Sequence, residues 1–423
     1  MSHILRSRAA LAMAAALVLT ACSSDTSSGA ATASATAERD LFGTVTPIAN
    51  NTSMEQAGLT MATMSIEAEH HAVVFDEEGV TYVEPRRSWG ADLVVHRILW
   101  DGTEAWTATV PVEVDTTGLS LELSQDPGLG VVALWFSAPD PDTPGSTIIL
   151  RPTSLMASGL TWFDLATGEQ GAQDVRSEAI ALQATASRSQ GHLIGAMHTD
   201  AQGDSPGLTY LSSERTMVTV SWPELTPVAA DPREVGQWAG SPLFTVNAAD
   251  GTSSLHLGAT EVVSGMTSNS PQTALGPDRI AVTDATRLWL VDRQGVSTEL
   301  DAGGCSLDNT LAGAPRAGAT EAYLGLSRVS LQDGTVECLE ALAPSPSASI
   351  MGGFSDGSLL LHAAPEDGPE VAWLVPADRS EARPLGRFKQ VRVLSDRIID
   401  TTLTQAGTTV VNAFDYRDLL PQD

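Results

Sequence analysis

The stretch LTWFDLATGE, residues 160–169, is an apolar and aromatic run that ends in a short polar turn. Branched and aromatic residues favour β-strands, and Asp, Thr and Gly favour the tight turns that close hairpins. Similar units recur as ILWDGTEAW (98–106), LWLVDRQGV (288–296), VSLQDGTV (329–336) and VAWLVPA (371–377). The sequence therefore predicts a fold built from repeated hairpins.

From about Thr60 onward, short apolar runs bounded by Asp-Gly, Thr-Gly, Pro and Asn follow one another. No long stretch has a 3.6-residue apolar period, and an Ala-rich piece at 177–186 has strand-like neighbours. The predicted strands include 93–100, 131–136, 147–150, 160–165, 216–222, 286–291, 358–362, 371–375 and 408–413. The predicted fold class is all-β.

The spacing of the repeats predicts a β-propeller. Trp289, Leu331 and Trp373 follow one another at intervals of 42 residues. Such a period, with about four strands per unit, is typical of propeller blades, which bury both faces of each sheet against neighbouring blades. Roughly 360 residues follow Thr60, and at roughly 40–50 residues per blade they accommodate seven or eight blades.

Two segments, WFDLATGE (162–169) and WDGTEAW (100–106), resemble blade repeats of the quinoprotein-like (PQQ-like repeat) β-propeller superfamily. In that superfamily an Asp-Leu-x-Thr-Gly turn closes the outer hairpin. The resemblance implies relatives of two kinds, cofactor-dependent dehydrogenases and non-catalytic lipoprotein scaffolds, and the fold does not choose between them. Alcohol-oxidising members carry an adjacent Cys-Cys pair near the cofactor. Because the three cysteines of this chain are not adjacent, we predict no cofactor.

The first 22 residues are typical of an export signal. Arg6 and Arg8 precede an apolar run at 9–19 that is too short to span a bilayer. The sequence Leu19-Thr20-Ala21-Cys22 then resembles the lipobox of bacterial lipoproteins, where the cysteine sulfur receives a diacylglyceryl group. Two acyl chains anchor a protein stably, whereas one binds marginally. We therefore predict a cell-membrane protein, lipid-anchored through Cys22 on the extracytoplasmic side; the alternative is an ordinary secretory signal with an incidental cysteine.

These patterns divide the chain into three segments. Residues 1–21 are the predicted signal peptide. Residues 22–40 contain the lipidated cysteine and a Ser/Thr/Ala-rich stretch that cannot form a core, so we predict a flexible tether with an r.m.s. span of roughly 23 Å. Residues 41–423 are the predicted propeller domain.

The chain is strongly acidic, with 23 basic and 52 acidic residues and a net charge of −29. Removal of residues 1–21, which include Arg6 and Arg8, leaves a net charge of −31. Such a surface repels nucleic acid and anionic headgroups, so we predict no nucleic-acid partner and a membrane contact made by lipid. The remaining predicted partner is an unidentified envelope protein or glycan.

Two cysteines remain after lipidation, Cys305 and Cys338. In an oxidising compartment such a pair is expected to form a disulfide, and the alternative is two buried thiols. A bridge requires Cα atoms within about 7 Å. If both cysteines belong to one blade, it would tie an early strand to the outer strand of that blade.

Several other motifs bear on whether the protein has a catalytic or metal site. GFSDG, residues 353–357, matches the G-x-S-x-G nucleophile elbow, but a strand follows it where the elbow requires a helix. His70 and His71 point to opposite faces of a strand, and the loop at 139–145 lacks EF-hand spacing. Trp89 and Trp238 lie in loop-like segments, where an aromatic side chain either anchors the loop or stacks on a sugar. We predict no catalytic residue and no metal site.

The favoured function is a non-catalytic propeller that serves binding or scaffolding in the cell envelope. The alternative is a secreted propeller-type glycan hydrolase, since two facing carboxylates could be hidden among 52 acidic residues. A solute-binding lipoprotein would normally show the βα alternation that is missing here.

Overall fold

A computed structural model describes residues 63–70, 72–86, 92–111, 120–126, 128–139, 155–171, 195–198, 207–225, 232–267, 272–276, 278–284, 286–305, 307, 321–324, 326–339, 348–363, 371–378, 382–386, 391–394 and 396–419. Every described residue lies within Leu41–Asp423. These residues are nearly all β, as predicted. Short helical turns occur at α1 (Trp222–Leu225) and η3 (Tyr416–Leu419).

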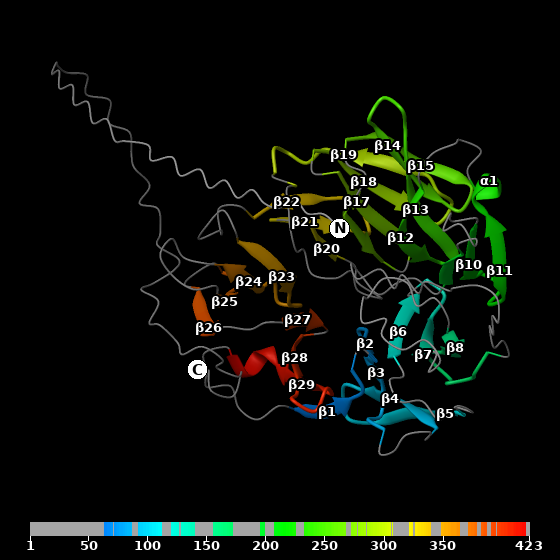
Figure 1. The fold of residues 1–423 in the computed structure, drawn as a ribbon. Helices are drawn as coiled ribbons and strands as arrows, with labels where there is room; N and C mark the ends of the chain where they lie inside the picture. Colours follow the sequence, from blue (N-terminus) through cyan, green and yellow to red (C-terminus); the bar gives the residue numbers. More distant parts are fainter. Residues whose placement is uncertain are drawn as a thin grey trace, which may run out of the picture. The chain divides into compact units, whose positions relative to one another are not determined.

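The described strands form eight antiparallel sheets, which we number I to VIII along the chain (Figure 1). Sheet I contains β2 (Val73–Phe75), β3 (Gly79–Val83), β4 (Leu93–Leu99) and β5 (Glu104–Val110). Sheet II contains β6 (Ser120–Asp126), β7 (Val131–Pro139) and β8 (Leu155–Asp164). Sheet III contains β9 (Gly195–His198), β10 (Gly207–Leu211) and β11 (Met217–Ser221). Sheet IV contains β12 (Pro232–Trp238), β13 (Ser241–Asn247), β14 (Ser253–Leu257) and β15 (Thr260–Met266).

The remaining sheets follow the same hairpin order. Sheet V contains β16 (Gln272–Leu275), β17 (Arg279–Thr283), β18 (Leu288–Asp292) and β19 (Ser297–Leu300). Sheet VI contains β20 (Glu321–Leu324), β21 (Ser327–Ser330) and β22 (Val336–Cys338). Sheet VII contains β23 (Ser349–Gly353), β24 (Leu359–Ala363), β25 (Val371–Val375) and β26 (Arg383–Gly386). Sheet VIII contains β27 (Val391–Leu394), β28 (Arg397–Leu403), β29 (Thr409–Asp415) and β1 (Met64–Ala68).

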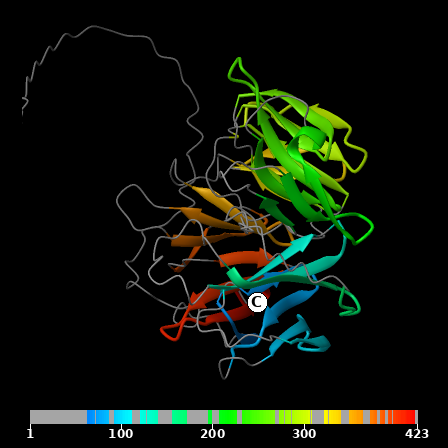
Figure 2. The same cartoon turned by 45° about the vertical axis from the view of Figure 1, so that its right-hand side comes forward.

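The first strand of the domain completes its last sheet. β1 pairs with β29 from Met64 opposite Ala413 to Ala68 opposite Thr409, so the two ends of the domain share sheet VIII. The blue N-terminal strands accordingly lie beside the red C-terminal strands in both views (Figures 1 and 2). This pairing joins the end of the β-propeller to its beginning without any covalent bond.

Apolar cores lie between successive sheets. Sheet I packs on sheet II around Leu93 and Phe163, and sheet IV packs on sheet V around Trp238 and Ile280. Equivalent cores join sheets III and IV, V and VI, VI and VII, VII and VIII, and VIII and I. Each sheet therefore buries apolar side chains on at least one neighbour, as the blades of a propeller do. The first strands also contact one another, β2 with β6, β16 with β20, β20 with β23, and β23 with β27.

Three hairpins share the tripeptide Asp-Gly-Thr, at 101–103, 250–252 and 333–335. In each, the Asp carboxylate accepts a hydrogen bond from the Thr backbone N–H, at 2.8, 2.9 and 3.0 Å respectively. The central glycine has a positive φ of 87°, 87° and 78°, a conformation that disfavours other residues. The turn signal of the sequence is therefore satisfied by local hydrogen bonding.

The 42-residue spacing does not mark one position in every sheet. Trp289 and Trp373 lie in β18 and β25, the third strands of their sheets, but Leu331 follows β21, the second strand of sheet VI. The interval arises because sheet VI begins at Glu321, late after sheet V, and sheet VII begins soon after it at Ser349. The predicted strand at 216–222 also ends early, since Trp222 begins α1, and the strand predicted at 147–150 lies outside the described residues.

Candidate functional site

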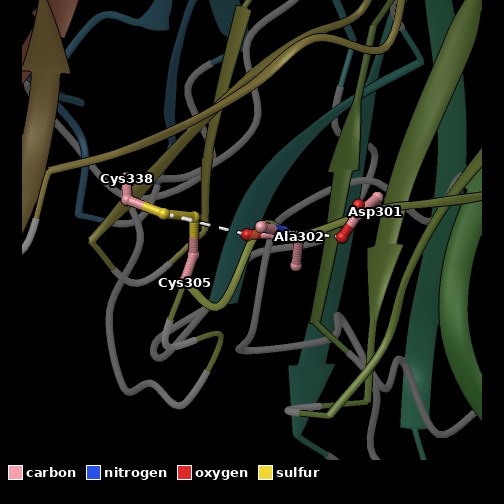
Figure 3. Close-up of a disulfide and its surroundings, with 5 residues drawn as sticks. Asp301, Ala302, Cys305 and Cys338 are labelled. Atoms are coloured by element: carbon pink, nitrogen blue, oxygen red, sulfur yellow. Dashed lines mark hydrogen bonds between the residues drawn. A yellow bond between two sulfur atoms is a disulfide. The ribbon is translucent and has the colours of Figure 1, made fainter.

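The predicted disulfide between Cys305 and Cys338 is present, with Cα atoms 5.2 Å apart (Figure 3). Its location corrects the expectation of a bridge within one blade. Cys305 follows β19 of sheet V, whereas Cys338 ends β22 of sheet VI. The two half-cystines are close because the Cys305 N–H donates to the Ala302 carbonyl in a turn (2.9 Å), and the Cys338 sulfur lies 3.7 Å from that same oxygen. The bridge therefore joins neighbouring sheets.

Several predicted features lie outside the described residues. They are Cys22, the signal peptide 1–21, the tether 22–40, Trp89, His71 and residues 140–145. Lipid anchoring through Cys22 consequently stays a prediction.

The G-x-S-x-G motif forms a hairpin turn between β23 and β24, as its sequence context predicts. The Ser355 hydroxyl donates to one Asp396 carboxylate oxygen at 2.5 Å, and the Ser355 N–H donates to the other at 2.7 Å. Asp396 follows β27, so the serine connects the turns of sheets VII and VIII. This arrangement gives Ser355 a structural role in place of the strained elbow of a hydrolase.

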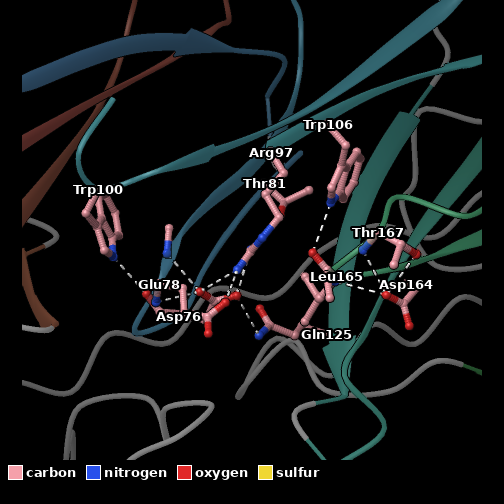
Figure 4. Close-up of polar contacts among 12 residues, drawn as sticks. Asp76, Glu78, Thr81, Arg97, Trp100, Trp106, Gln125, Asp164, Leu165 and Thr167 are labelled. Carbon is pink, nitrogen blue, oxygen red and sulfur yellow. Dashed lines mark hydrogen bonds and ion pairs between the residues drawn. The ribbon is translucent and has the colours of Figure 1, made fainter. Parts of the chain in front are cut away.

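A buried ion pair holds the first turn of sheet I (Figure 4). Asp76 and Arg97 are 5% and 2% exposed, and the guanidinium donates to both carboxylate oxygens at 2.8 and 3.0 Å. The same carboxylate accepts from the backbone of Glu78 and Gly79 and, across the sheet boundary, from Gln125 of β6 at 3.5 Å. A buried carboxylate needs this many donors, because desolvation is costly unless it is offset.

A second buried carboxylate connects three sheets. Asp126, at the end of β6, accepts from the backbone N–H groups of Ala239 (3.1 Å) and Gly240 (2.9 Å) in the β12–β13 turn. It also accepts from the Gln237 side chain (2.9 Å), which donates in turn to the Leu211 carbonyl of β10 (2.9 Å). Gly240 has φ of 77°, and a Cβ there would clash with the Ser213 backbone nitrogen, so sheets II, III and IV meet closely at this point.

The LATG turn of the repeat that predicted the fold packs on the preceding sheet. The Trp106 indole N–H of β5 donates to the Leu165 carbonyl at 2.9 Å (Figure 4). A Cβ on Gly168 would lie 2.6 Å from the indole ring, so glycine is required there by contact as well as by its φ of 71°. Asp164 also pairs with Arg215 of the β10–β11 turn at 2.7 Å.

Two glutamates flank one histidine on sheet I. Glu84 and Glu104 oxygens lie 3.5 and 3.4 Å from the Nε2 and Nδ1 atoms of His96. The imidazole stacks on Tyr82 at 5.2 Å, and burial followed by the charges of Glu84 and Glu104 raises the Tyr82 pKa. The ring thus fills the space between the carboxylates, where a glycosidase requires the sugar and, in inverting enzymes, a water molecule.

The sequence predicts that Trp238 lies in a loop-like segment, where it anchors the loop or stacks on a sugar. It ends β12 instead, is 0% exposed, and its indole donates to the Gly276 carbonyl at 2.8 Å. Trp238 therefore anchors the boundary between sheets IV and V. Over the described parts of the chain, no group of three or more His, Cys, Asp or Glu side chains is placed to hold a metal ion, and no helix is long and apolar enough to span a membrane.

The sequence did not indicate that Asp76 and Asp126 link different sheets. Asp76 lies in the β2–β3 turn and Asp126 ends β6 directly before a turn. An aspartate at such a position commonly accepts local backbone hydrogen bonds, and the remote partners become visible only in the folded chain. The sequence offers one hint of a buried polar contact near Asp126, the preceding residue Gln125. A buried glutamine requires a polar partner, and Gln125 is buried in the structure.

No family model and no curated protein matches the chain. Among solved structures it is similar to virginiamycin B lyase from Staphylococcus aureus, at 9% identity and TM-score 0.33, over 83% of this chain and 98% of that one. It is similar to the β-propeller domain of the Trilobed protease from Pyrococcus furiosus, at 9% identity and TM-score 0.33, over 77% and 100%. The match to TolB from Acinetobacter baumannii has 10% identity and TM-score 0.26, over 79% and 78%. These similarities assign neither a family nor an activity.

Proposed function

We propose that the protein is a lipid-anchored, extracytoplasmic β-propeller that acts as a non-catalytic binding or scaffolding module in the cell envelope. We infer that each of the eight sheets is one blade. The observation that carries the proposal is the use of polar groups at the sheet boundaries: Asp76 and Asp126 each collect donors from a neighbouring sheet. Such contacts favour a rigid body that presents fixed surfaces, as a scaffold requires.

The place where the chain enters the domain is compatible with an anchor. β1 occupies the edge of sheet VIII opposite β27, and it is the first described strand after the N-terminal residues. The described strand that is nearest in sequence to Cys22 is therefore an edge strand and not an inner strand of its sheet.

Membrane fractionation of the full-length chain tests the anchor in a bacterium that processes lipoproteins. We expect the wild type to remain in the membrane fraction after a high-salt wash and to incorporate labelled palmitate. Cys22→Ser should lose both properties, whereas the double variant Cys305→Ser/Cys338→Ser should keep both. Membrane retention of Cys22→Ser after the wash would contradict the proposal.

Incubation with isolated envelope glycan tests the absence of catalysis. The wild type in neutral detergent should release no new reducing ends over the protein-free control. Release that disappears in Glu84→Gln or Glu104→Gln would establish the hydrolase alternative, because these carboxylates flank His96.

A further inference from the structure

Arg392 occupies an unusual position in sheet VIII. It lies in β27, the first strand of that sheet, between Val391 and Val393, which are buried in the core shared with sheet VII. Because side chains alternate along a strand, Arg392 points to the opposite face, toward sheet I. There its guanidinium carbon lies 5.8 Å from the ring centre of Phe75 in β2. We call this boundary the β27/β2 seam.

Most other arginines whose contacts are described bind oxygen atoms, and Arg397 lies over the Trp100 ring at 5.9 Å. Seven pair with carboxylates and Arg279 donates to a backbone carbonyl; the seven are Arg86, Arg97, Arg215, Arg287, Arg293, Arg328 and Arg417. The guanidinium of Arg392 lies over Phe75, but it has no hydrogen bond and no ion pair among the described residues. The chain has 52 acidic residues, so a shortage of carboxylates does not explain why the Arg392 guanidinium has no ion pair among the described residues.

The Arg392 side chain is exposed, but many protein atoms lie around its guanidinium. Partial desolvation by these atoms lowers the pKa of the guanidinium. An arginine remains protonated at neutral pH under such a shift. The seam therefore holds a partly desolvated positive charge with no counter-charge among the described residues, and binding an anion would offset that cost.

The contact with Phe75 leaves the hydrogen-bonding edges of Arg392 available. A cation–π contact uses the guanidinium as a charge above the ring, and the five N–H donors lie in the guanidinium plane. Two parallel N–H groups match a carboxylate or a phosphate. Phe75 also stacks on Trp100 (6.5 Å), so the charge borders an aromatic surface.

We propose that the β27/β2 seam binds an organic oxyanion, a carboxylate or phosphate group, through the guanidinium of Arg392. This proposal deepens the binding role proposed above and rests on it, but it requires neither the lipid anchor nor a protein partner. It names the kind of group that an envelope glycan or peptide would present to the propeller.

Calorimetric titration of the full chain in neutral detergent at constant ionic strength tests the site. The probes are sodium glucuronate, inorganic phosphate and, as the neutral control, methyl glucoside. We expect the wild type to bind at least one anion and not the neutral sugar. Loss of the fork in Arg392→Lys should weaken binding about tenfold or more, and Arg392→Gln should abolish it. Arg293→Gln removes the same charge from an exposed ion pair and should bind normally.

The outcomes separate ligand binding from a purely structural contact. Binding of glucuronate but not phosphate would identify a carboxylate ligand, and the reverse a phosphate ligand. If neither anion binds the wild type, or if Arg392→Gln binds as tightly as the wild type, the proposal is overturned. Should Arg392→Gln fail to fold, the anion affinities of Arg392→Lys and Arg293→Gln are compared instead. Weaker binding by Arg392→Lys supports the proposal, and equal affinities overturn it. Loss of this site would leave membrane retention through Cys22 unaffected, so the two proposals fail separately.

Discussion

At the scale of single residues, the aspartates of this protein divide into two groups with similar sequence contexts. Asp101 and Asp250 accept hydrogen bonds from within their own exposed turns. Asp126 and Asp284 are buried and accept bonds from a different sheet as well. The sequence shows a turn in both cases, because the remote donors depend on the packing of sheets and not on neighbouring residues.

Asp126→Asn should be strongly destabilising. One carboxylate oxygen would become an amide NH₂ facing N–H donors of Gln237, Ala239 or Gly240, so at least one hydrogen bond to a charged group is lost and donors are left unpaired. We expect the free energy of unfolding to fall by about 2–3 kcal/mol, measured by urea denaturation. The matched control Asp101→Asn, in an exposed turn, should lower the free energy of unfolding much less. Equal effects of the two substitutions would contradict a special role for Asp126.

Asp284 gives a pH dependence with a defined sign. Burial raises its pKa, but hydrogen bonds from Thr267, Thr286 and Arg287 outweigh burial and lower the pKa from 3.8 to about 2. A depressed pKa stabilises the fold above the unfolded-state value, and this contribution, about 2 kcal/mol, is lost as the pH falls from about 4 to about 2.

The measurement is the free energy of unfolding between pH 5 and pH 2 for wild type and Asp284→Asn. The difference between the two proteins should shrink as the pH falls through this window. A difference that stays constant over the window would show that the Asp284 carboxylate does not titrate as expected.

At the scale of strands and hairpins, the sequence predicts individual turns but not which strands occupy equivalent positions in successive sheets. Asp-Gly-Thr specifies a turn because the carboxylate, the glycine φ and the threonine N–H act within three residues. The 42-residue interval instead depends on the lengths of connections, which vary between sheets. For that reason Leu331 does not correspond to Trp289 and Trp373, and the predicted disulfide proved to join two sheets.

The disulfide between sheets V and VI should stabilise the domain. It closes a loop with a sequence separation of 33, and on the chain-entropy model this contributes about 3.5–4 kcal/mol, less any strain. Reduction, or Cys305→Ala/Cys338→Ala, should lower the melting temperature seen by circular dichroism. Two thiols that react with a labelling reagent in the unreduced, denatured protein would show that the bridge does not form.

At the scale of the whole molecule, sequence patterns indicated the β-propeller but not the seam at which the domain closes. β1 and β29 lie more than 340 positions apart, and neither strand carries a signal that names the other. The Arg392 candidate site lies at a boundary of the same sheet VIII and was missed for the same reason. Its one described contact, Phe75, belongs to a strand far away in sequence, and a lone arginine within an apolar run resembles any exposed strand residue.

Closure by β1 can be tested with two truncations. Removal of residues 1–40 leaves the described domain intact and should leave a folded, strand-rich protein. Removal of residues 1–69 also deletes β1, so the backbone groups of β29 from Thr409 to Ala413 lose their partners and part of the core between sheets VIII and I, including the contacts of Ile66, is exposed. Such an unpaired edge promotes aggregation.

We therefore expect the shorter protein to melt at a lower temperature and to aggregate, and a synthetic peptide covering residues 63–69 to restore part of its stability in a concentration-dependent manner. Binding of the peptide is favoured because Met64 to Ala68 form a five-residue ladder with β29, whereas a peptide of scrambled order cannot place Ile66 in the apolar core. The two truncated proteins differ only by residues 41–69, which include β1. Identical melting temperatures would therefore mean that β1 does not hold the domain closed.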